Sequence, residues 1–355
     1  MRAGMGTSSS GGGGSRAEAS DPVRSPRPLP RQVPPVPTVL AVDGNSLGHR
    51  AFHAKHRDAP GGAFVTGTVV GMLATAWSYG PYDAIVVGFD HPDNRRKLDH
   101  PEYKAHRPPT HPDLPGHLAD LRVHLADCGF TVLEEDGAEA DDLLAATADA
   151  CTVRGWSCDL LTSDRDLTAI VGPGVRLLRP RASMADLLVE DEAAVRRTYG
   201  IEPHQYTDLA ALRGDPSDGL RGAKGIGPKT AARLLRDHGS VLGIYAALHD
   251  LHPKVEAALR TSRADVERNL LLMAPIPNLD VDVDAAVERG VDLACLATSL
   301  DGLGLPWASA RFRNAVTAPP PPPVPPPPEE PDGPVATPTR VRPAPVTVGE
   351  QGALF

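Results

Sequence analysis

Acidic residues follow short apolar runs along this chain of 355 residues. Asp43 follows the apolar run 39–42, and Asp90 follows the run 85–89. Such runs are typical of buried strands, and parallel strands bring their carboxyl ends to one edge of a sheet, where open α/β proteins keep their sites. The pattern therefore predicts an α/β fold with carboxylates gathered at one sheet edge.

Nine acidic residues form the candidate metal site. Like charges a few ångströms apart raise one another's pKa values, so such a cluster needs neutralising cations. Oxygen ligands favour Mg²⁺ or Mn²⁺, and we expect two or more ions that assist phosphoryl chemistry. The candidate ligands are Asp43, Asp90, Glu139, Asp141, Asp142, Asp164, Asp166, Asp215 and Asp218.

A plainer interpretation exists for some of these clusters. Glu139 opens a helical pattern after Gly137, and Asp164 follows a strand, so each could serve only as a helix cap. Glu139 and Asp142 are three residues apart and share a helix face, from which both can point to one place. The capping interpretation stays open for each cluster alone, and their conjunction favours a metal site.

The composition leaves nucleic acid open as a partner in spite of the net charge of −9. The nine candidate ligands account for that charge, which leaves the rest of the chain neutral. Four cysteines without a CxxC spacing are typical of a reduced, cytoplasmic protein. No apolar run reaches the ~20 residues of a membrane span, and the N-terminus lacks the apolar core of a signal peptide, so no membrane partner is expected.

Four segments are expected along the chain. Residues 1–37 are rich in Gly, Ser and Pro, and 317–355 open with proline runs, so both are predicted to be disordered. Strand and helix patterns alternate over 38–200, which predicts a parallel sheet with crossover helices, and helical patterns alone follow over 201–316. The expected strands are 39–42, 85–89 and 159–162, and the expected helices are 65–79, 118–128, 140–153, 205–212, 228–237 and 241–248.

A glycine-rich turn leads into a helix in the second domain. The segment reads Lys224-Gly225-Ile226-Gly227-Pro228-Lys229-Thr230, with proline in the first helical turn. Glycines let the backbone approach a phosphate, and a helix N-terminus offers free N–H groups. The flanking lysines favour a sequence-independent contact with a DNA backbone, and an ordinary helical hairpin is the alternative.

Residues 91–117 are polar, basic and interrupted by proline. They include Arg96, Tyr103, Lys104 and Arg107. Basic residues beside a tyrosine suit single-stranded nucleic acid through charge and stacking, and a solvated surface loop is the alternative.

Lysine is scarce in the chain, with six against 30 arginines. Four of the six lie in the two basic segments, which favours a role for a compact ammonium there. These four are Lys97, Lys104, Lys224 and Lys229.

Six stretches resemble the bacterial 5′→3′ exonuclease and flap endonuclease family, the kind fused ahead of DNA polymerase I. They are VDGNSLGHRAFHA (42–54), FD (89–90), RKLDHPEYKAHR (96–107), GAEADDLLA (137–145), LLTSDRDL (160–167) and LRGDPSDGLRGAKGIGPKTAARLL (212–235). The resemblance implies a PIN-like nuclease domain over 38–200 and a helix–three-turn–helix DNA-binding domain over 201–316. Since no polymerase sequence follows, we expect a free-standing nuclease.

The resemblance also implies roles for single residues. The nine carboxylates would hold the metal ions, Arg96 and Lys104 would act near the scissile phosphate, and the hairpin loop could hold a monovalent cation. Substrates would be DNA with 5′ ends or flaps, and RNA primers. A non-catalytic DNA-junction binding or scaffold protein is the alternative, and the intact acidic set favours the enzyme. Three residues depart from the family's usual aromatic, asparagine and proline: Arg95, Gly219 and Arg221.

The last five residues are Gln351-Gly352-Ala353-Leu354-Phe355. They resemble the Gln-x-x-Leu-Phe peptide by which bacterial replication and repair enzymes dock on the β sliding clamp. Leu354 and Phe355 could fill an apolar pocket, while the Gln351 amide bonds polar groups at its rim. The resemblance implies a sliding-clamp partner, and an arbitrary C-terminus is the alternative.

Overall fold

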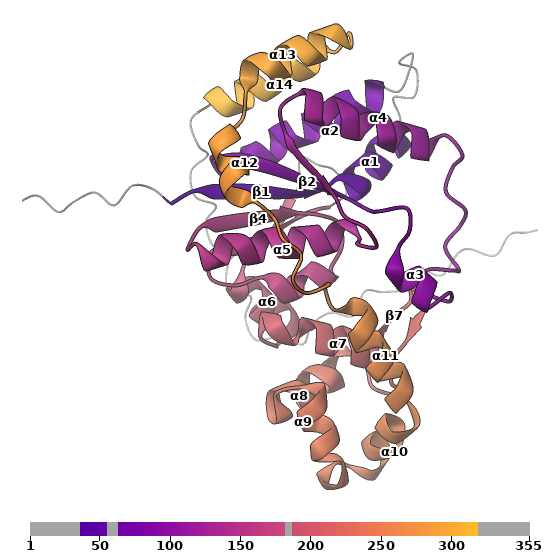
Figure 1. The fold of residues 1–355 in the computed structure, drawn as a ribbon. Coiled ribbons are helices and arrows are strands. Elements are labelled where there is room, and N and C mark those ends of the chain that lie inside the picture. The colour runs from indigo at the N-terminus through magenta and orange to yellow at the C-terminus, as the bar shows by residue number, and fades with distance from the viewer. Residues whose placement is uncertain (1–35, 55–62, 182–186, 319–355) are drawn as a thin grey trace, which may run out of the picture. The chain divides into compact units, whose positions relative to one another are not determined.

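The computed structural model describes residues 36–54, 63–181 and 187–318. A six-stranded sheet in the order β3-β2-β1-β4-β5-β6 lies at its centre (Figure 1). The first five strands along the chain are parallel and the last is antiparallel to its neighbour, which confirms the expected α/β class. The strands are β1 (Thr38–Asp43), β2 (Ala84–Phe89), β3 (Thr131–Glu134), β4 (Ser157–Leu161), β5 (Val175–Pro180) and β6 (Leu187–Glu190).

The three expected strands are confirmed as β1, β2 and β4, and the other three were not expected. β1 and β2 are buried on both faces, so they read as continuous apolar runs. β3 is only partly buried, and β5 carries Arg176 and Arg179 among its apolar residues. Partly polar strands toward the ends of a sheet lack the apolar run on which the expectation depended.

Helices cover both faces of the sheet (Figure 1). Leu40 and Val42 of β1 face a core shared with α1 (Gly44–His53), α2 (Ala63–Trp77) and α4 (Leu114–Asp127). The alternate residues of β1, Val39 and Ala41, face a second core that includes α5 (Ala140–Val153). This division follows from the alternation of side chains along a strand.

A second, helical part follows α6 (Glu192–Tyr199) and has a core of its own. Its buried side chains include Tyr206, Leu212, Ile226 and Leu235. Its elements are α7 (Tyr206–Arg213), the hairpin of β7 (Gly214–Asp215) and β8 (Leu220–Arg221), α8 (Pro228–His238), α9 (Val241–Ala246), α10 (Pro253–Thr261) and α11 (Arg263–Met273). Three short 3₁₀ helices, η1 (Asp166–Ile170), η2 (Pro203–Gln205) and η3 (Leu248–Asp250), and the single-turn α3 (Arg95–Asp99) complete the set up to this point.

The chain then returns to the sheet, which corrects the expected extent of the helical domain. We expected that domain to run from 201 to 316. The last helices, α13 (Leu293–Gly302) and α14 (Pro306–Thr317), instead bury Leu296, Leu300 and Phe312 in the core to which α2 belongs. α12 (Val283–Arg289) joins the core on the opposite face of the sheet. The apolar surface of α2 needs a cover, and α14 supplies it.

The residues from Pro37 to Ala318 form one compact unit within the described ranges. None of the helices in those ranges combines the length and apolarity that crossing a bilayer requires. The residues predicted to form a clamp-binding peptide, Gln351, Leu354 and Phe355, lie outside the described ranges, as do nearly all of the two tails predicted to be disordered.

Candidate metal centre and nucleic-acid interface

A cavity of about 750 Å³ opens at the carboxyl edge of the sheet. Six of the nine predicted ligands line it, together with the cationic side chains of Lys104 and Arg107. The other three, Asp142, Asp166 and Asp218, line a smaller adjoining space. The six carboxylates are Asp43, Asp90, Glu139, Asp141, Asp164 and Asp215.

Asp43 is fixed at the end of β1 by two hydrogen bonds. It caps α1, where its carboxylate accepts from the Ser46 N–H at 2.7 Å and from the Thr162 hydroxyl at 2.8 Å. Gly44 follows because a Cβ there would collide with the ring of Phe89. Burial, together with the charge of Asp90, raises the pKa of Asp43 from 3.8 to about 7.

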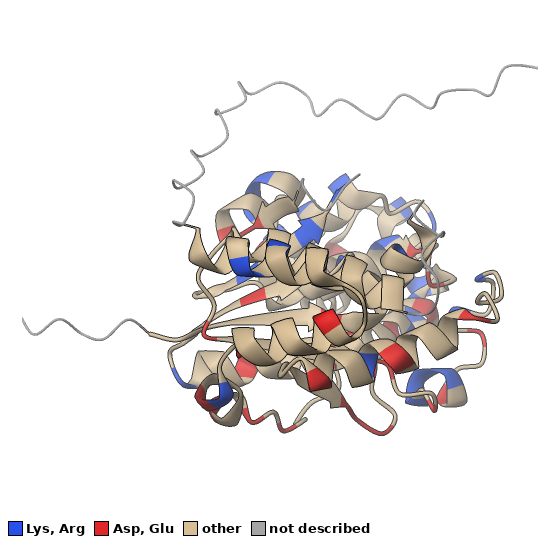
Figure 2. Cartoon of the chain, turned by 90° about the horizontal axis from the view of Figure 1, so that it is seen from above, with Lys and Arg blue, Asp and Glu red and all other residues tan. Residues whose placement is uncertain are grey.

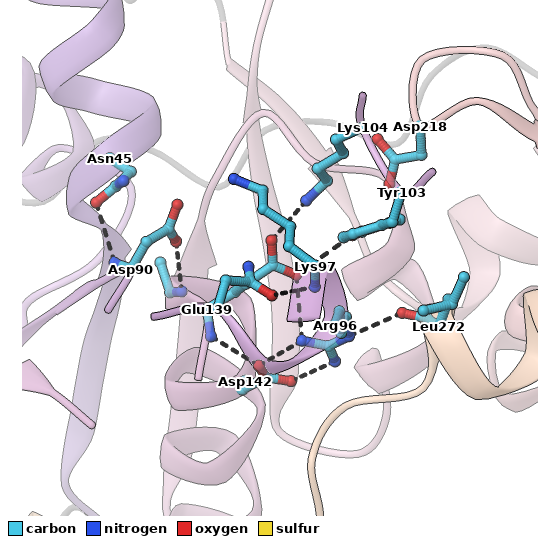
Figure 3. A network of polar contacts seen from close by, with 12 residues as sticks. Asn45, Asp90, Arg96, Lys97, Tyr103, Lys104, Glu139, Asp142, Asp218 and Leu272 are labelled. Carbon is cyan, nitrogen blue, oxygen red and sulfur yellow. Dashed lines mark hydrogen bonds and ion pairs between the residues drawn. The ribbon is translucent and has the colours of Figure 1, made fainter. Parts of the chain in front are cut away.

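Asp90 is held at the end of β2 in a similar way. Its carboxylate accepts from the Ala140 N–H at 2.8 Å, and its own N–H donates to the Asn45 side chain at 3.1 Å (Figure 3). Burial raises its pKa, and the charge of Glu139 acts in the same direction. Both strand-end aspartates are thus oriented by the helices that begin beside them.

The carboxylates fit divalent cations because several oxygens are buried without a partner. Asp141 Oδ1 and Asp166 Oδ1 have no hydrogen bond within the described residues. Burial and neighbouring acids, Asp164 first among them, raise the pKa of Asp141 well above its usual range and that of Asp166 to about 8. Buried carboxyl oxygens that ionise only when positive charge is supplied are suitable ligands for Mg²⁺ and Mn²⁺, which prefer oxygen donors.

These side chains do not yet enclose an ion as they stand. In the ranges that the structure describes, no three Asp, Glu, His or Cys side chains lie close enough together to hold a metal. Metal binding therefore requires them to approach one another or to share an ion through water.

Asp142 differs from the other predicted ligands because its carboxylate is already saturated. It accepts two bonds of 2.7 Å from the Arg96 guanidinium, one of 2.9 Å from the Glu139 N–H and one of 2.8 Å from the Ile276 N–H. Only 1% of its side chain is exposed. The structure contradicts our expectation of a metal ligand here, because no carboxylate lone pair is left for an ion.

Arg96 is saturated as well, which contradicts its expected role at the scissile phosphate. Its five N–H groups donate to Asp142 twice, to Glu139 at 3.1 Å, and to the carbonyls of Leu272 at 2.9 Å and Ala274 at 2.8 Å. A guanidinium has five donors, and all of them are used. Arg96 therefore joins α3, α5 and the end of α11, and it has no donor to offer a substrate (Figure 3).

Glu139 lies between the metal cavity and this buried pair. It accepts from the Lys104 ammonium at 2.7 Å, and from Arg96 and the Tyr103 hydroxyl on its other oxygen. Burial opposes its ionisation, but the charges of Lys104 and Arg96 outweigh burial and hold the pKa of Glu139 below its usual value. Glu139 is thus anionic at neutral pH without a metal.

Tyr103 and Lys104 take different directions from one turn of chain. Tyr103 is 5% exposed and packs in the core of the helical part, so it cannot stack on a base as we expected. Lys104 has φ of +58°, a left-handed conformation that is uncommon outside glycine. Its N–H donates to the Asp218 carbonyl at 3.1 Å, and its ammonium reaches the cavity as expected.

Asp215 and Asp218 come to the site on the β7–β8 hairpin. Arg107 donates to the Asp218 carboxylate at 2.6 Å and to the Ser217 carbonyl at 3.2 Å. Asn269 of α11, which is fully buried, donates to the Ala211 and Arg221 carbonyls at 3.1 and 2.8 Å and so fixes the base of the hairpin. No sequence pattern pointed to Asn269, since its role depends on backbone groups far away in the chain.

Lys97 is a further residue whose role the sequence left unassigned. It belongs to α3, is exposed, and extends past Glu139 into the space between Asp90 and Lys104 (Figure 3). Its charge acts to lower the pKa of Asp90, as does that of Lys104. Scarcity of lysine was the only sequence signal that pointed to it.

The glycine-rich turn has the exposure that a phosphate contact needs. Ile226 is 5% exposed and anchors the turn, whereas Lys224, Gly225, Gly227 and Lys229 are all exposed. Thr230 follows in the first turn of α8, which begins at Pro228 as expected. A Cβ at Gly225 or Gly227 would meet no atom within 4 Å, so the backbone there is open to a ligand.

Basic and acidic residues are both spread around the molecule in the view from above (Figure 2). Attraction of a polyanion therefore depends on local clusters rather than on one basic side. The exposed lysines of the turn form one such cluster, and Lys97, Lys104 and Arg107 form another beside the metal cavity.

Two family models match consecutive parts of the chain. Residues 38–200 match the 5′-3′ exonuclease N-terminal resolvase-like domain, and residues 201–291 match the 5′-3′ exonuclease C-terminal SAM fold. The chain belongs to the 5′-3′ exonuclease family. Members of this family are nucleases that act on DNA phosphodiester bonds, and the chain is similar to the nuclease regions of several DNA polymerases I.

Among these relatives, DNA polymerase I of Mycobacterium bovis is 38% identical over 239 residues, which covers 66% of this chain and 26% of that protein. The thermostable DNA polymerase I of Thermus thermophilus is 36% identical over 273 residues, covering 75% of this chain and 32% of that protein. The chain thus spans about a quarter to a third of these relatives.

Two solved structures share the fold. T5 5′-exonuclease with bound zinc ions has a TM-score of 0.54 and 22% identity, covering 79% of this chain and 99% of the other. The catalytic core of Rad2 in complex with DNA has a TM-score of 0.51 and 15% identity, covering 79% and 92%. These likenesses confirm a PIN-like parallel-sheet domain with a helical SAM-like domain after it.

Proposed function

We propose that this chain is a divalent-metal-dependent nuclease that hydrolyses DNA phosphodiester bonds at 5′ ends and 5′ flaps. The observation that carries the proposal is the cavity at the sheet edge, where six carboxylates stand beside the Lys104 ammonium. A cavity lined by both carboxylates and a cationic side chain can hold metal ions together with an anionic phosphate. Since the donors are all oxygen, we propose Mg²⁺ or Mn²⁺ as the ions.

The ligands would be the predicted carboxylates other than Asp142: Asp43, Asp90, Glu139, Asp141, Asp164, Asp166, Asp215 and Asp218. Bound ions would supply an activated water and positive charge at the phosphate. The chain's own part is to orient the carboxylates. Ser46 and Thr162 fix Asp43, and the Ala140 N–H fixes Asp90.

Lys104 is the residue we propose to contact the scissile phosphate. Its ammonium has three donors, and Glu139 takes one of them at 2.7 Å. The others can donate to phosphate oxygens as negative charge develops on them. The unusual backbone of Lys104 and its bond to the Asp218 carbonyl hold the side chain in this direction.

The exposed turn at Lys224–Thr230 would hold the duplex. Contacts from lysines and backbone N–H groups to phosphates carry no sequence information, which suits an enzyme that acts on a DNA end or flap wherever it forms. The Rad2 core, which shares the fold, is described in complex with DNA. A monovalent cation at this turn stays a prediction from the family resemblance.

The alternative, a non-catalytic junction-binding or scaffold protein, is not favoured. Such a protein would have no need of buried aspartate oxygens without partners, and Asp141 and Asp166 each have one. The test is a duplex with a labelled 5′ flap. Mg²⁺-dependent release of label, abolished by EDTA, is expected, whereas binding without cleavage in both Mg²⁺ and Mn²⁺ would favour the scaffold.

Three further parts of the proposal concern partners and place. We propose RNA primers as additional substrates and the β sliding clamp as a partner of Gln351, Leu354 and Phe355. Deletion of Leu354 and Phe355 should abolish clamp binding in calorimetry and leave clamp-free cleavage unchanged. A cytoplasmic location is supported by the absence of disulfides among the described cysteines, because reduced thiols are typical of that compartment.

A further inference from the structure

Three cationic side chains lie at or beside the carboxylate cavity on the segment between β2 and α4. Arg107 lines the cavity and pairs with Asp218 at 2.6 Å. The other two are lysines that Figure 3 shows near Asp90 and Glu139. Lys104 is one, and its ammonium already bonds Glu139 at 2.7 Å. Lys97 is the other, and no carboxylate of the described residues lies within ion-pair distance of its ammonium. Its three N–H donors are therefore available to a ligand.

The direction of Lys97 is imposed by its neighbours. The Lys97 N–H donates to the side chain of Asn94, which is buried and caps α3. The Arg95 N–H donates to the Gly137 carbonyl at 3.1 Å, two residues before Glu139. Arg96, with all five donors used, fixes the same turn to Asp142. Because consecutive residues of a helix point about 100° apart, fixing Arg96 toward Asp142 turns Lys97 away from Asp142. Figure 3 shows the Lys97 side chain extending between Asp90 and Lys104.

The position of Lys97 suits an anion and not the metal ions. Its charge lies near enough to Asp90 to act on that carboxylate, so it competes with a cation bound there. Since the Lys97 ammonium weakens metal binding at Asp90, we expect the interaction that Lys97 provides to be with the anionic substrate. Since the Lys97 ammonium lies between Asp90 and Lys104, a phosphate bound beside Asp90 could accept hydrogen bonds from both lysines (Figure 3).

We propose that Lys97 is a catalytic residue that contacts the scissile phosphate or its 5′ neighbour, in the role that Arg96 cannot fill. The inference rests on the proposed nuclease function. Lysine suits the role because its long side chain, attached to a fixed helix, can keep its ammonium in contact with the phosphate while negative charge develops on the phosphate oxygens.

The test compares Lys97→Ala with Arg95→Ala, a control on the same helix whose side chain is 78% exposed and pairs with Asp99. Single-turnover cleavage of a pre-bound 5′-flap duplex should fall about 30-fold or more in Lys97→Ala, since a contact that strengthens in the transition state lowers the rate of the bound complex. Affinity for the same duplex in Ca²⁺ should change by less than about threefold. Lys97→Arg should recover part of the rate, and Arg95→Ala should match the unaltered protein.

A second readout separates this role from a structural one. Removing a positive charge beside Asp90 should tighten Mn²⁺ binding to the DNA-free protein about threefold in calorimetry, while cleavage slows. A structural role would weaken both and lower the melting temperature. Cleavage within twofold of Arg95→Ala, or weaker Mn²⁺ binding with a lower melting temperature, would overturn the inference alone. Failure of the unaltered protein to cleave would overturn the proposed function and this inference with it.

Discussion

Arg96 and Asp142 face each other as a buried, bidentate pair, with Nη1–Oδ2 and Nη2–Oδ1 both at 2.7 Å. The pair joins α3 to the first turn of α5. The pair also fixes the segment by which the chain leaves the helical part. Arg96 donates to the carbonyls of Leu272 and Ala274, and Asp142 accepts from the Ile276 N–H. Neither residue has a donor or acceptor left for a metal or a substrate.

Breaking this pair should therefore act on stability before it acts on chemistry. Arg96→Ala leaves the buried Asp142 carboxylate without its counter-charge, which costs about 3–5 kcal/mol of unfolding free energy. Asp142→Ala should cost less, because Arg96 keeps its ion pair with Glu139 at 3.1 Å. Urea denaturation of each variant measures the loss. Exposed Arg263→Ala, which removes a pair with Glu267 on the surface of α11, is the control and should cost under about 1 kcal/mol. A stable Asp142→Ala with abolished Mn²⁺ binding would restore Asp142 as a ligand.

Asp141 is the carboxylate whose loss should abolish chemistry and spare the fold. Its Oδ1 is buried without a hydrogen-bond partner. Asp141→Asn therefore removes the charge of a proposed metal ligand without breaking a hydrogen bond to that oxygen. We expect cleavage to fall at least about 100-fold, with flap-duplex binding nearly unchanged, because the DNA contacts lie elsewhere. Single-turnover cleavage and fluorescence anisotropy give the two values. Equal losses of cleavage and binding would contradict this separation.

The metal-free protein should lose stability as pH rises, and metal should reverse the loss. Asp43 and Asp166 have folded-state pKa values of about 7 and about 8 against an ordinary 3.8, so the folded state binds protons that the unfolded state has released. Their contribution is complete below pH about 4 and is lost as pH rises through 7 and 8. Melting temperatures in EDTA should fall between pH 5 and 8, and Mg²⁺ or Mn²⁺ should raise them most at pH 8.

A control variant identifies the groups responsible. Asp43→Asn with Asp166→Asn should flatten the fall in EDTA, because neither amide titrates. A melting temperature that rises from pH 5 to 8 without metal would show that these carboxylates are ionised throughout.

The exposed lysines of the turn should contribute to DNA binding through charge alone. Lys224→Ala with Lys229→Ala should weaken binding to all duplex sequences alike and reduce the slope of log affinity against log salt by about 2. Lys254, at the start of α10, provides the matched control. Titrations from 50 to 200 mM KCl measure the slope, and an unchanged slope would place the duplex contact elsewhere.

Asn269 should be necessary for the hairpin that carries Asp215 and Asp218. Asn269→Ala leaves the Ala211 and Arg221 carbonyls without their donor, at a cost of about 1–3 kcal/mol of stability. Metal affinity should fall with it, because the hairpin loses its support from α11. Asn269→Asp, which keeps the shape and loses the donor, should behave like Asn269→Ala in both urea denaturation and Mn²⁺ calorimetry, whereas a purely steric role would leave it normal.

The sequence by itself determined where the chain turns at the sheet edge. A strand that is buried on both faces can be predicted from its apolar run alone, without knowledge of its neighbours. The residue that ends the strand must lie at the edge of the sheet, so the pattern alone placed Asp43 and Asp90 there. The bounds of α5 follow equally from local signals, because Glu139 and Asp142 form a capping box at its start.

Only the tertiary structure decided which of these side chains are free to act. Asp142 is saturated by Arg96 and by Ile276, 134 residues away, and Tyr103 is buried against helices far along the chain. The packing of α14 on α2 likewise joins segments more than 200 residues apart. The number of free donors and acceptors on a side chain depends on partners from distant segments, and no local pattern of residue types records it.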